Sequence, residues 1–204
     1  PIEPKTQYIL VSALHTKIAL SGKKIEDLAY LPRMTDAYKL AAMQILMLVN
    51  PAASQAGSSL FPLTILAMVR LSIKYGNSEF STYGYCIYGA MLCDRFGNIE
   101  EGYRFGKLGL LVLEKFNAKS LNCKLYNLFT SMIWHFKEPA KYMIEPALEG
   151  RQSGLETGDI ESVSYINWLV AINSFFYGEN LESLERKILN YIGLTKQLKI
   201  AVLF

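Results

Sequence analysis

Few residues in this sequence are of types that catalyse reactions or bind metals. The two histidines are His15, with no carboxylate near it in sequence, and His135, which precedes Glu138 by three residues. One histidine with one carboxylate is too small a set for a metal site. Histidine is also favoured near a helix C-terminus, where it interacts with the helix dipole. We therefore predict structural roles for both histidines.

The three cysteines do not form a recognisable metal or redox motif. Cys86, Cys93 and Cys123 are odd in number and are not closely paired. Cys86 and Cys93 are seven residues apart, which places them on one face of a helix. We interpret all three as small buried apolar groups in a reducing compartment.

The acidic residues of the second half do not form a motif either. Five of them could be imagined as ligands of a divalent ion: Glu145, Glu149, Glu156, Asp159 and Glu161. Their spacing distributes them around helix faces and does not match a calcium loop, so a solvated surface is the better interpretation. Gly22-Lys23-Lys24 lacks the earlier glycine and the following Ser or Thr of a phosphate-binding loop. The sequence thus predicts no catalytic residue, no cofactor, no metal site and no enzymatic activity of this chain.

Composition excludes two classes of partner. The formal net charge of the 204 residues is +3, and the basic residues are scattered, so no run could neutralise a nucleic-acid backbone. The longest apolar run, Leu40 to Val49, is half the length that spans a bilayer and is ended by Asn50 and Pro51. We expect neither nucleic acid nor membrane as a partner. The start at Pro1 and the apolar end IAVLF (200–204) indicate a piece of a longer chain.

Helix signals cover the whole chain. Before residue 58 we expect an irregular group of three helices, one from Thr6 to a stop at Gly22, a short one before Pro32, and one capped by Thr35 or Asp36. The composition of residues 51–59, PAASQAGSS, predicts a loop. It separates the irregular part, 1–57, from a regular array of helical hairpins, 58–204, within one domain.

Turn signals in this array recur about every 20 residues. They lie at 76–77, 97–98, 117–118, 137–139, 158–159 and 178–179. Asn98 and Glu101 form a capping-box pattern, in which the glutamate reaches back to the backbone of the cap. Two helices per unit give a repeat of about 41 residues.

Small residues suggest close helix packing. One strip consists of Gly102, Gly106 and Gly109, and another of Ala147, Gly150 and Gly154, although Pro146 should kink the second helix. The predicted fold is all-α, a right-handed superhelix of antiparallel helix pairs.

Aromatic residues carry the most functional content. One helical stripe is offset from another on the same helix: Tyr165, Trp168, Ile172 and Phe175 against Val163, Asn167, Val170 and Ser174. The first stripe either lines a binding groove or is buried against adjacent repeats. For a groove, we predict five lining residues: Tyr83, Asn127, Trp134, Tyr165 and Trp168.

Two resemblances support this interpretation. Tyr85, Gly89, Gly102 and Gly106 sit roughly where tetratricopeptide repeats place aromatic and small residues. The unit here is longer than the about 34 residues of that repeat and lacks its closing proline, so the chain is only similar to it.

Six segments, spread over nearly the whole chain, resemble a helical region of large bacterial signalling proteins. They are MTDAYKLAAMQIL (34–46), SSLFPLTIL (58–66), LSIKYGNS (71–78), FGNIEEGYRFGKLGL (96–110), FNAK (116–119) and GRQSGLETGDIE (150–161). In that family a serine/threonine kinase-like domain and a STAND-type, AAA-like ATPase precede the helical region, and a GAF domain and a histidine kinase follow it.

The resemblance implies a cytoplasmic linker or sensor arm that couples an ATPase to a kinase output. Its partners would be neighbouring domains of the same polypeptide. The alternative is a domain that senses a small molecule in its groove. The oligomeric state, the signal and the docking surface stay open.

Overall fold

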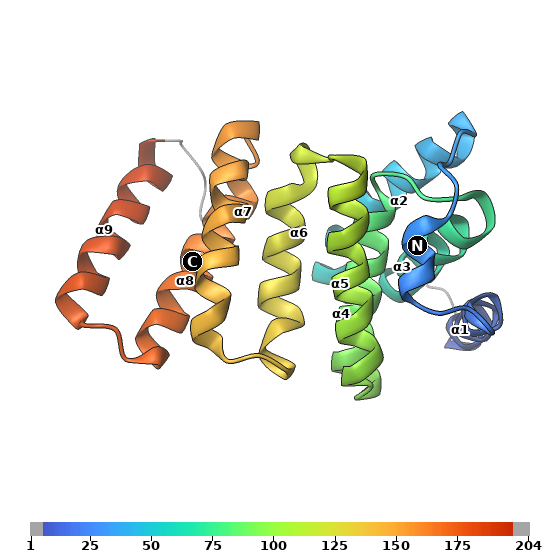
Figure 1. The fold of residues 1–204 in the computed structure, drawn as a ribbon, viewed down its shortest axis with the longest axis horizontal. Helices are drawn as coiled ribbons and strands as arrows, with labels where there is room; N and C mark the ends of the chain where they lie inside the picture. Colours follow the sequence, from blue (N-terminus) through green and yellow to red (C-terminus); the bar gives the residue numbers. More distant parts are fainter. Residues whose placement is uncertain (1–5, 198–204) are drawn as a thin grey trace. The chain divides into compact units, whose positions relative to one another are not determined.

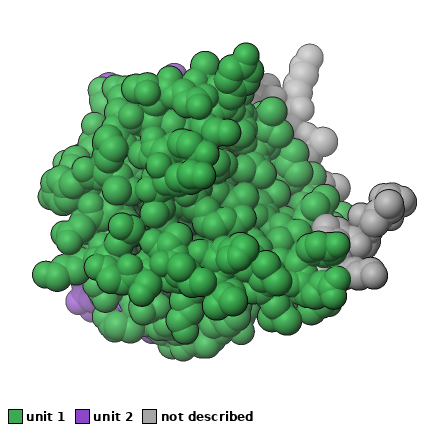
Figure 2. Space-filling model, turned by 90° about the vertical axis from the view of Figure 1, so that its right-hand side faces the viewer, with its two compact units in different colours: residues 1–117 green, residues 118–204 purple. Residues whose placement is uncertain are grey.

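A computed structural model of the chain describes residues 6–197 and confirms the all-α prediction (Figure 1). These residues form nine α-helices, three short 3-10 helices and no strand, with one isolated β-bridge between Arg33 and Asn77. The chain divides into two compact units, residues 1–117 and 118–204, which Figure 2 colours separately. The sequence predicts an earlier boundary, at residue 57, between irregularly spaced helices and regular helical hairpins. The apolar segment 200–204 lies outside the described residues, and the hand of the superhelix stays a prediction.

Residues 6–117, the described part of the first unit, form five α-helices and one 3-10 helix. They are α1 (Thr6–Leu20), η1 (Glu26–Tyr30), α2 (Ala37–Gln55), α3 (Leu60–Tyr75), α4 (Ser81–Phe96) and α5 (Ile99–Phe116). Of the two candidate caps of α2, the structure selects Asp36, whose Oδ1 accepts from the amides of Tyr38 and Lys39 at 2.9 and 3.2 Å. Helix α3 ends at Gly76, as predicted.

The loop predicted for residues 51–59 is wrong over its first half, because α2 continues through Pro51 to Gln55. Proline removes one hydrogen bond from a helix interior, but tertiary contacts hold this turn in place. The buried amide of Asn50 donates to the Thr64 hydroxyl at 2.7 Å and to the Phe61 carbonyl at 3.3 Å. These bonds tie the end of α2 to α3.

The glycine strip of α5 packs against α4, as predicted. A Cβ atom added to Gly89 of α4 would lie 2.5 Å from the carbonyl oxygen of Gly102 and 2.9 Å from the amide nitrogen of Gly106. A Cβ atom on Gly109 would lie 2.8 Å from the carbonyl oxygen of Thr82. Glycine is therefore needed on both helices, since no side chain fits between these backbones.

The turn between α4 and α5 differs in one detail from a capping box. Asn98 Oδ1 accepts from the Glu101 amide at 3.3 Å, as predicted. The Glu101 carboxylate accepts from the side-chain amide of Asn98 at 2.9 Å and not from its backbone. The backbone N–H of Asn98 already donates to the Leu92 carbonyl at 3.0 Å, where it satisfies the end of α4.

The second unit, as far as residue 197, forms four α-helices and two 3-10 turns. They are α6 (Lys119–Met132), η2 (Trp134–Phe136), η3 (Ala140–Met143), α7 (Ile144–Thr157), α8 (Ile160–Tyr177) and α9 (Leu181–Gln197). Consecutive α-helices pack against each other as hairpins (Figure 1). The core between α6, α7 and α8 consists of Cys123, Ala147, Val163, Ile166 and Val170.

The second small-residue strip also packs as predicted. A Cβ atom on Gly150 would lie 2.5 Å from Cβ of Tyr126, and one on Gly154 would collide with Cys123 and with Val163. The kink expected at Pro146 is not required, because α7 begins at Ile144. Proline in a first turn removes an N–H that has no partner within the helix.

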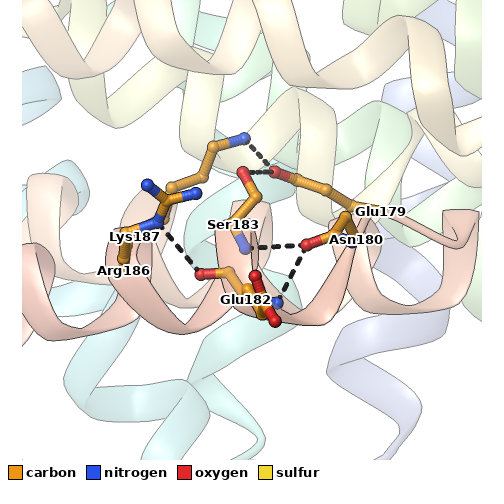
Figure 3. Close-up of polar contacts among 6 residues, drawn as sticks. All are labelled: Glu179, Asn180, Glu182, Ser183, Arg186 and Lys187. Atoms are coloured by element: carbon orange, nitrogen blue, oxygen red, sulfur yellow. Dashed lines mark hydrogen bonds and ion pairs between the residues drawn. The ribbon is translucent and has the colours of Figure 1, made fainter.

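Helix α9 begins with a polar cluster, drawn in Figure 3. Asn180 Oδ1 caps the helix by accepting from the amides of Glu182 and Ser183 at 3.0 and 3.2 Å. Glu179 Oε1 accepts from the Ser183 hydroxyl at 2.9 Å and from Lys187 Nζ at 2.6 Å. The ammonium of Lys187 lowers the pKa of the Glu179 carboxyl. The break predicted at 178–179 thus has a well-defined capping structure.

Candidate interaction surface

The residues that resembled catalytic groups are dispersed. Within residues 6–197, no three His, Cys, Asp or Glu side chains lie close enough to hold a metal ion. His135 lies in η2 with its ring 4.2 Å from that of Phe136, and His15 is exposed on α1.

The cysteines are buried, as predicted. Cys86 and Cys93 both face α5, where they lie against Gly109 and Gly102. Burial raises the pKa of the Cys86 thiol, and burial together with the Asp159 charge raises the pKa of Cys123 to about 12. These thiols stay protonated at neutral pH, so they are poor nucleophiles and act as apolar core groups.

Tyr83 was predicted to line the groove, and this is wrong, because the residue is only 4% exposed. Its hydroxyl donates to Asn50 Oδ1 at 2.8 Å inside the first unit. Tyr85 is bound in the same way, with its hydroxyl 2.9 Å from Asn77 Oδ1, and the Asn77 amide donates to the Leu28 carbonyl at 2.7 Å. Two buried asparagines thus hold two tyrosines of α4 in the core, and burial raises the pKa of both phenols.

Trp134 and Asn127 lie in the second unit and are half-buried. The indole N–H of Trp134 donates to the Pro139 carbonyl at 3.2 Å, and its ring meets Phe129 edge-on at 5.8 Å. These contacts hold the turn after α6 together. Whether either residue also contacts a partner stays a prediction.

Helix α8 exposes the aromatic stripe that the sequence singled out. The exposed fractions are 48% for Tyr165, 52% for Trp168, 36% for Ile172 and 57% for Phe175. The offset residues of the same helix are buried: Val163, Asn167, Val170 and Ser174. The alternative prediction, in which both faces of this helix are buried, is thus wrong for the described residues. We call Tyr165, Trp168, Ile172 and Phe175 the α8 stripe.

Sequence reasoning missed the end of this surface. Phe176 and Tyr177 are 78% and 58% exposed and follow the stripe directly. The Phe175 and Phe176 rings meet nearly perpendicularly, with centroids 5.7 Å apart. Three aromatic residues in a row before Gly178 were the available signal, since three consecutive helical positions cannot all face the core.

The rotation of α8 is fixed from its buried side. Asn167 Oδ1 accepts from Arg151 Nε of α7 at 2.6 Å, and the Arg151 guanidinium stacks over the Tyr191 ring of α9 at 5.2 Å. This link across three helices holds the buried face inward. The α8 stripe is therefore presented to solvent by a packed scaffold.

The fold and this surface define an all-helical hairpin domain with an exposed aromatic stripe. Comparisons with family models, curated proteins and solved structures found no match to the chain. None of the helices in residues 6–197 combines the length and the apolar character needed to cross a bilayer.

Proposed function

We propose that this chain is a non-catalytic interaction and regulatory module that binds a protein segment through the α8 stripe. One observation carries the proposal: four large apolar side chains are exposed on a helix that has no charged residue from Ser162 to Tyr177. Contiguous apolar surface of this kind is uncommon on monomers and is typical of binding sites.

The side chains of the stripe suit a protein ligand. Tyrosine and tryptophan give large contact areas and lose little conformational entropy, and one such anchor can contribute about 2 kcal/mol or more. A polar tip remains available on Tyr165 and on Trp168 for a hydrogen bond with the partner. The buried link through Arg151 keeps these anchors in one arrangement.

The proposed partner is a neighbouring domain of the same polypeptide, in the cytoplasm. This part rests on the resemblance of the six sequence segments to bacterial signalling proteins, in which the helical region lies between an ATPase and a kinase. In that setting the α8 stripe would relay the state of the ATPase to the kinase output.

Photo-crosslinking in cells tests the proposal. A benzoylphenylalanine at Trp168 should crosslink to a protein segment, whereas one at the exposed Glu185 of α9 should not. Alanine at Trp168 and Phe175 should abolish the contact, and alanine at Tyr142, which is 57% exposed, should preserve it. Equal crosslinking from both positions would contradict the proposal. A small molecule that is retained by the chain and lost on Trp168→Ala would favour the sensor instead.

A further inference from the structure

Helix α1 packs in an unusual orientation. Its two buried residues are polar, Ser12 and Thr16, with exposed fractions of 8% and 0%. Five of its large apolar side chains are exposed, Tyr8 58%, Leu10 65%, Val11 51%, Leu14 57% and Ile18 62%, whereas Ile9 and Leu20 are half-buried. We call Leu10, Val11, Leu14 and Ile18 the α1 stripe.

A hydrogen-bonded arginine determines this orientation. Arg70 of α3 places one guanidinium nitrogen 2.6 Å from Ser12 Oγ, 3.0 Å from the Ser12 carbonyl and 3.0 Å from Thr16 Oγ1. This cation is half-buried, and even partial burial is costly without such acceptors. The two hydroxyls face α3, and the α1 stripe lies on the exposed part of the helix.

The spacing of the α1 stripe fits another helix. Leu10, Leu14 and Ile18 follow at intervals of four, and Val11 fills the position beside them. This pattern of i, i+4 and i+8 forms a narrow ridge along one side of a helix. Such a ridge is the usual contact between two amphipathic helices.

The charges beside the α1 stripe restrict the partner. No Asp or Glu occurs between Thr6 and Ile25, and the exposed Lys17, Lys23 and Lys24 make this region basic. A second copy would bring the same three lysines, and of the two carboxylates that follow them Glu26 is bound by Arg104, which leaves only Asp27. A helix with carboxylates beside its apolar ridge would instead complement both features.

From these observations we propose that the α1 stripe binds an acidic amphipathic helix of a partner protein. Lipid is the weaker candidate, because three lysines are fewer than the about four to eight basic residues of anionic-lipid sites. The ridge is also narrow, and Lys17 lies between Leu14 and Ile18. This surface shares no residue with the α8 stripe and does not depend on the function proposed above.

Two synthetic amphipathic peptides with the same leucine ridge test the proposal, one flanked by glutamate and the other by lysine. In fluorescence anisotropy with the full chain at low salt, the acidic peptide should bind at least about tenfold more tightly. The double variant Leu10→Ser/Leu14→Ser should weaken it at least about tenfold. The matched control Ile45→Ser/Leu48→Ser on α2 changes side chains that are 60% and 62% exposed and should leave binding unchanged.

The lysines are tested separately. Lys17→Gln/Lys23→Gln/Lys24→Gln should remove most of the preference for the acidic peptide, and circular dichroism should show that each variant is folded. Should the serine variant unfold, the lysine variant decides the question, because its changes lie on exposed side chains.

Other results would overturn the proposal. One is equal affinity for both peptides, and another is unchanged binding of the acidic peptide by the folded serine variant. Self-association through α1 in sedimentation, or α1-dependent binding to phosphatidylserine vesicles, would also contradict it. Trp168→Ala should leave peptide binding unchanged, which separates this test from that of the α8 stripe.

Discussion

Helices α4 and α8 are similar in length and are both rich in aromatic residues, but they expose them differently. Every residue of α4 from Ser81 to Cys93 is buried. On α8, buried residues alternate with the exposed aromatic residues of the α8 stripe. Aromatic content therefore does not distinguish a core helix from a helix that presents a surface.

The position of the hydrogen-bonding groups accounts for the difference. On α4 the tyrosine hydroxyls reach buried amides, so the rings enter the core together with their polar tips. On α8 the buried polar groups are Ser162, Asn167 and Ser174, and Asn167 accepts from Arg151 of the neighbouring helix. The hydrogen bonds of Tyr83 and Tyr85 thus accompany the burial of α4, whereas the buried face of α8 is mainly apolar, with Val163, Ile166 and Val170 in the core.

The packing of α4 can be broken most strongly at Gly89. In Gly89→Ala the new methyl would meet the backbone of α5 at 2.5 Å. We expect a steric cost of about 3 kcal/mol, partly offset by about 1 kcal/mol of improved helix propensity. Urea denaturation should therefore show a net loss of about 2 kcal/mol. Gly193→Ala on α9 is the matched control, because nothing lies within 4 Å of its added Cβ, and it should not destabilise the chain.

A smaller loss is expected when the Tyr85 hydroxyl is removed. Tyr85→Phe leaves the buried Asn77 Oδ1 without this donor, which should cost about 1 to 2 kcal/mol in thermal or urea unfolding. Tyr165→Phe on α8 makes the same chemical change on a 48% exposed side chain and should be nearly neutral. Equal losses in both variants would remove the distinction between the two helices.

Truncation of the α8 stripe should cost still less. Trp168→Ala removes a half-exposed ring, so we expect a loss below about 1 kcal/mol and an unchanged helical signal. A loss of about 3 kcal/mol would identify Trp168 as a core residue.

The smallest effect concerns an exposed ion pair of the first unit. Arg104 binds both oxygens of Glu26, at 2.7 and 2.8 Å, and lowers the pKa of that carboxyl to about 2. Because the folded pKa is lower than the unfolded one, the pair stabilises the fold above the unfolded value and loses its effect as pH falls through about 2. Both side chains are exposed, so salt should weaken the effect further. The stability difference between the wild type and Glu26→Gln, measured by urea unfolding from pH 7 to 2, should be small and should disappear at low pH.

The sequence predicted most of the fold because its signals are local. Glycine turns, the Asp36 cap and the glycine strip of α5 each depend on neighbouring residues or on one adjacent helix. Pro51 was misinterpreted because contacts from Asn50 to α3 hold that helix beyond the proline. Long-range contacts of this kind are not visible in a single sequence.

Prediction of the candidate surface was less complete for the same reason. The α8 stripe was found by its helical spacing, whereas Tyr83 was misplaced, because its partner Asn50 lies 33 residues away in sequence. The α1 stripe was missed, because the residues that turn it outward are joined through Arg70, 58 residues from Ser12.

Accessibility of the Trp168 indole is the most direct test of an exposed aromatic surface on α8. In the variant Trp134→Phe, Trp168 is the only tryptophan, so acrylamide quenching of its fluorescence reports on this surface alone. We expect red-shifted emission and quenching well above that of a buried indole, because 52% of the residue is exposed. Blue-shifted emission with strong protection from acrylamide would mean that the α8 stripe is covered, and would contradict both the exposed surface and the function proposed for it.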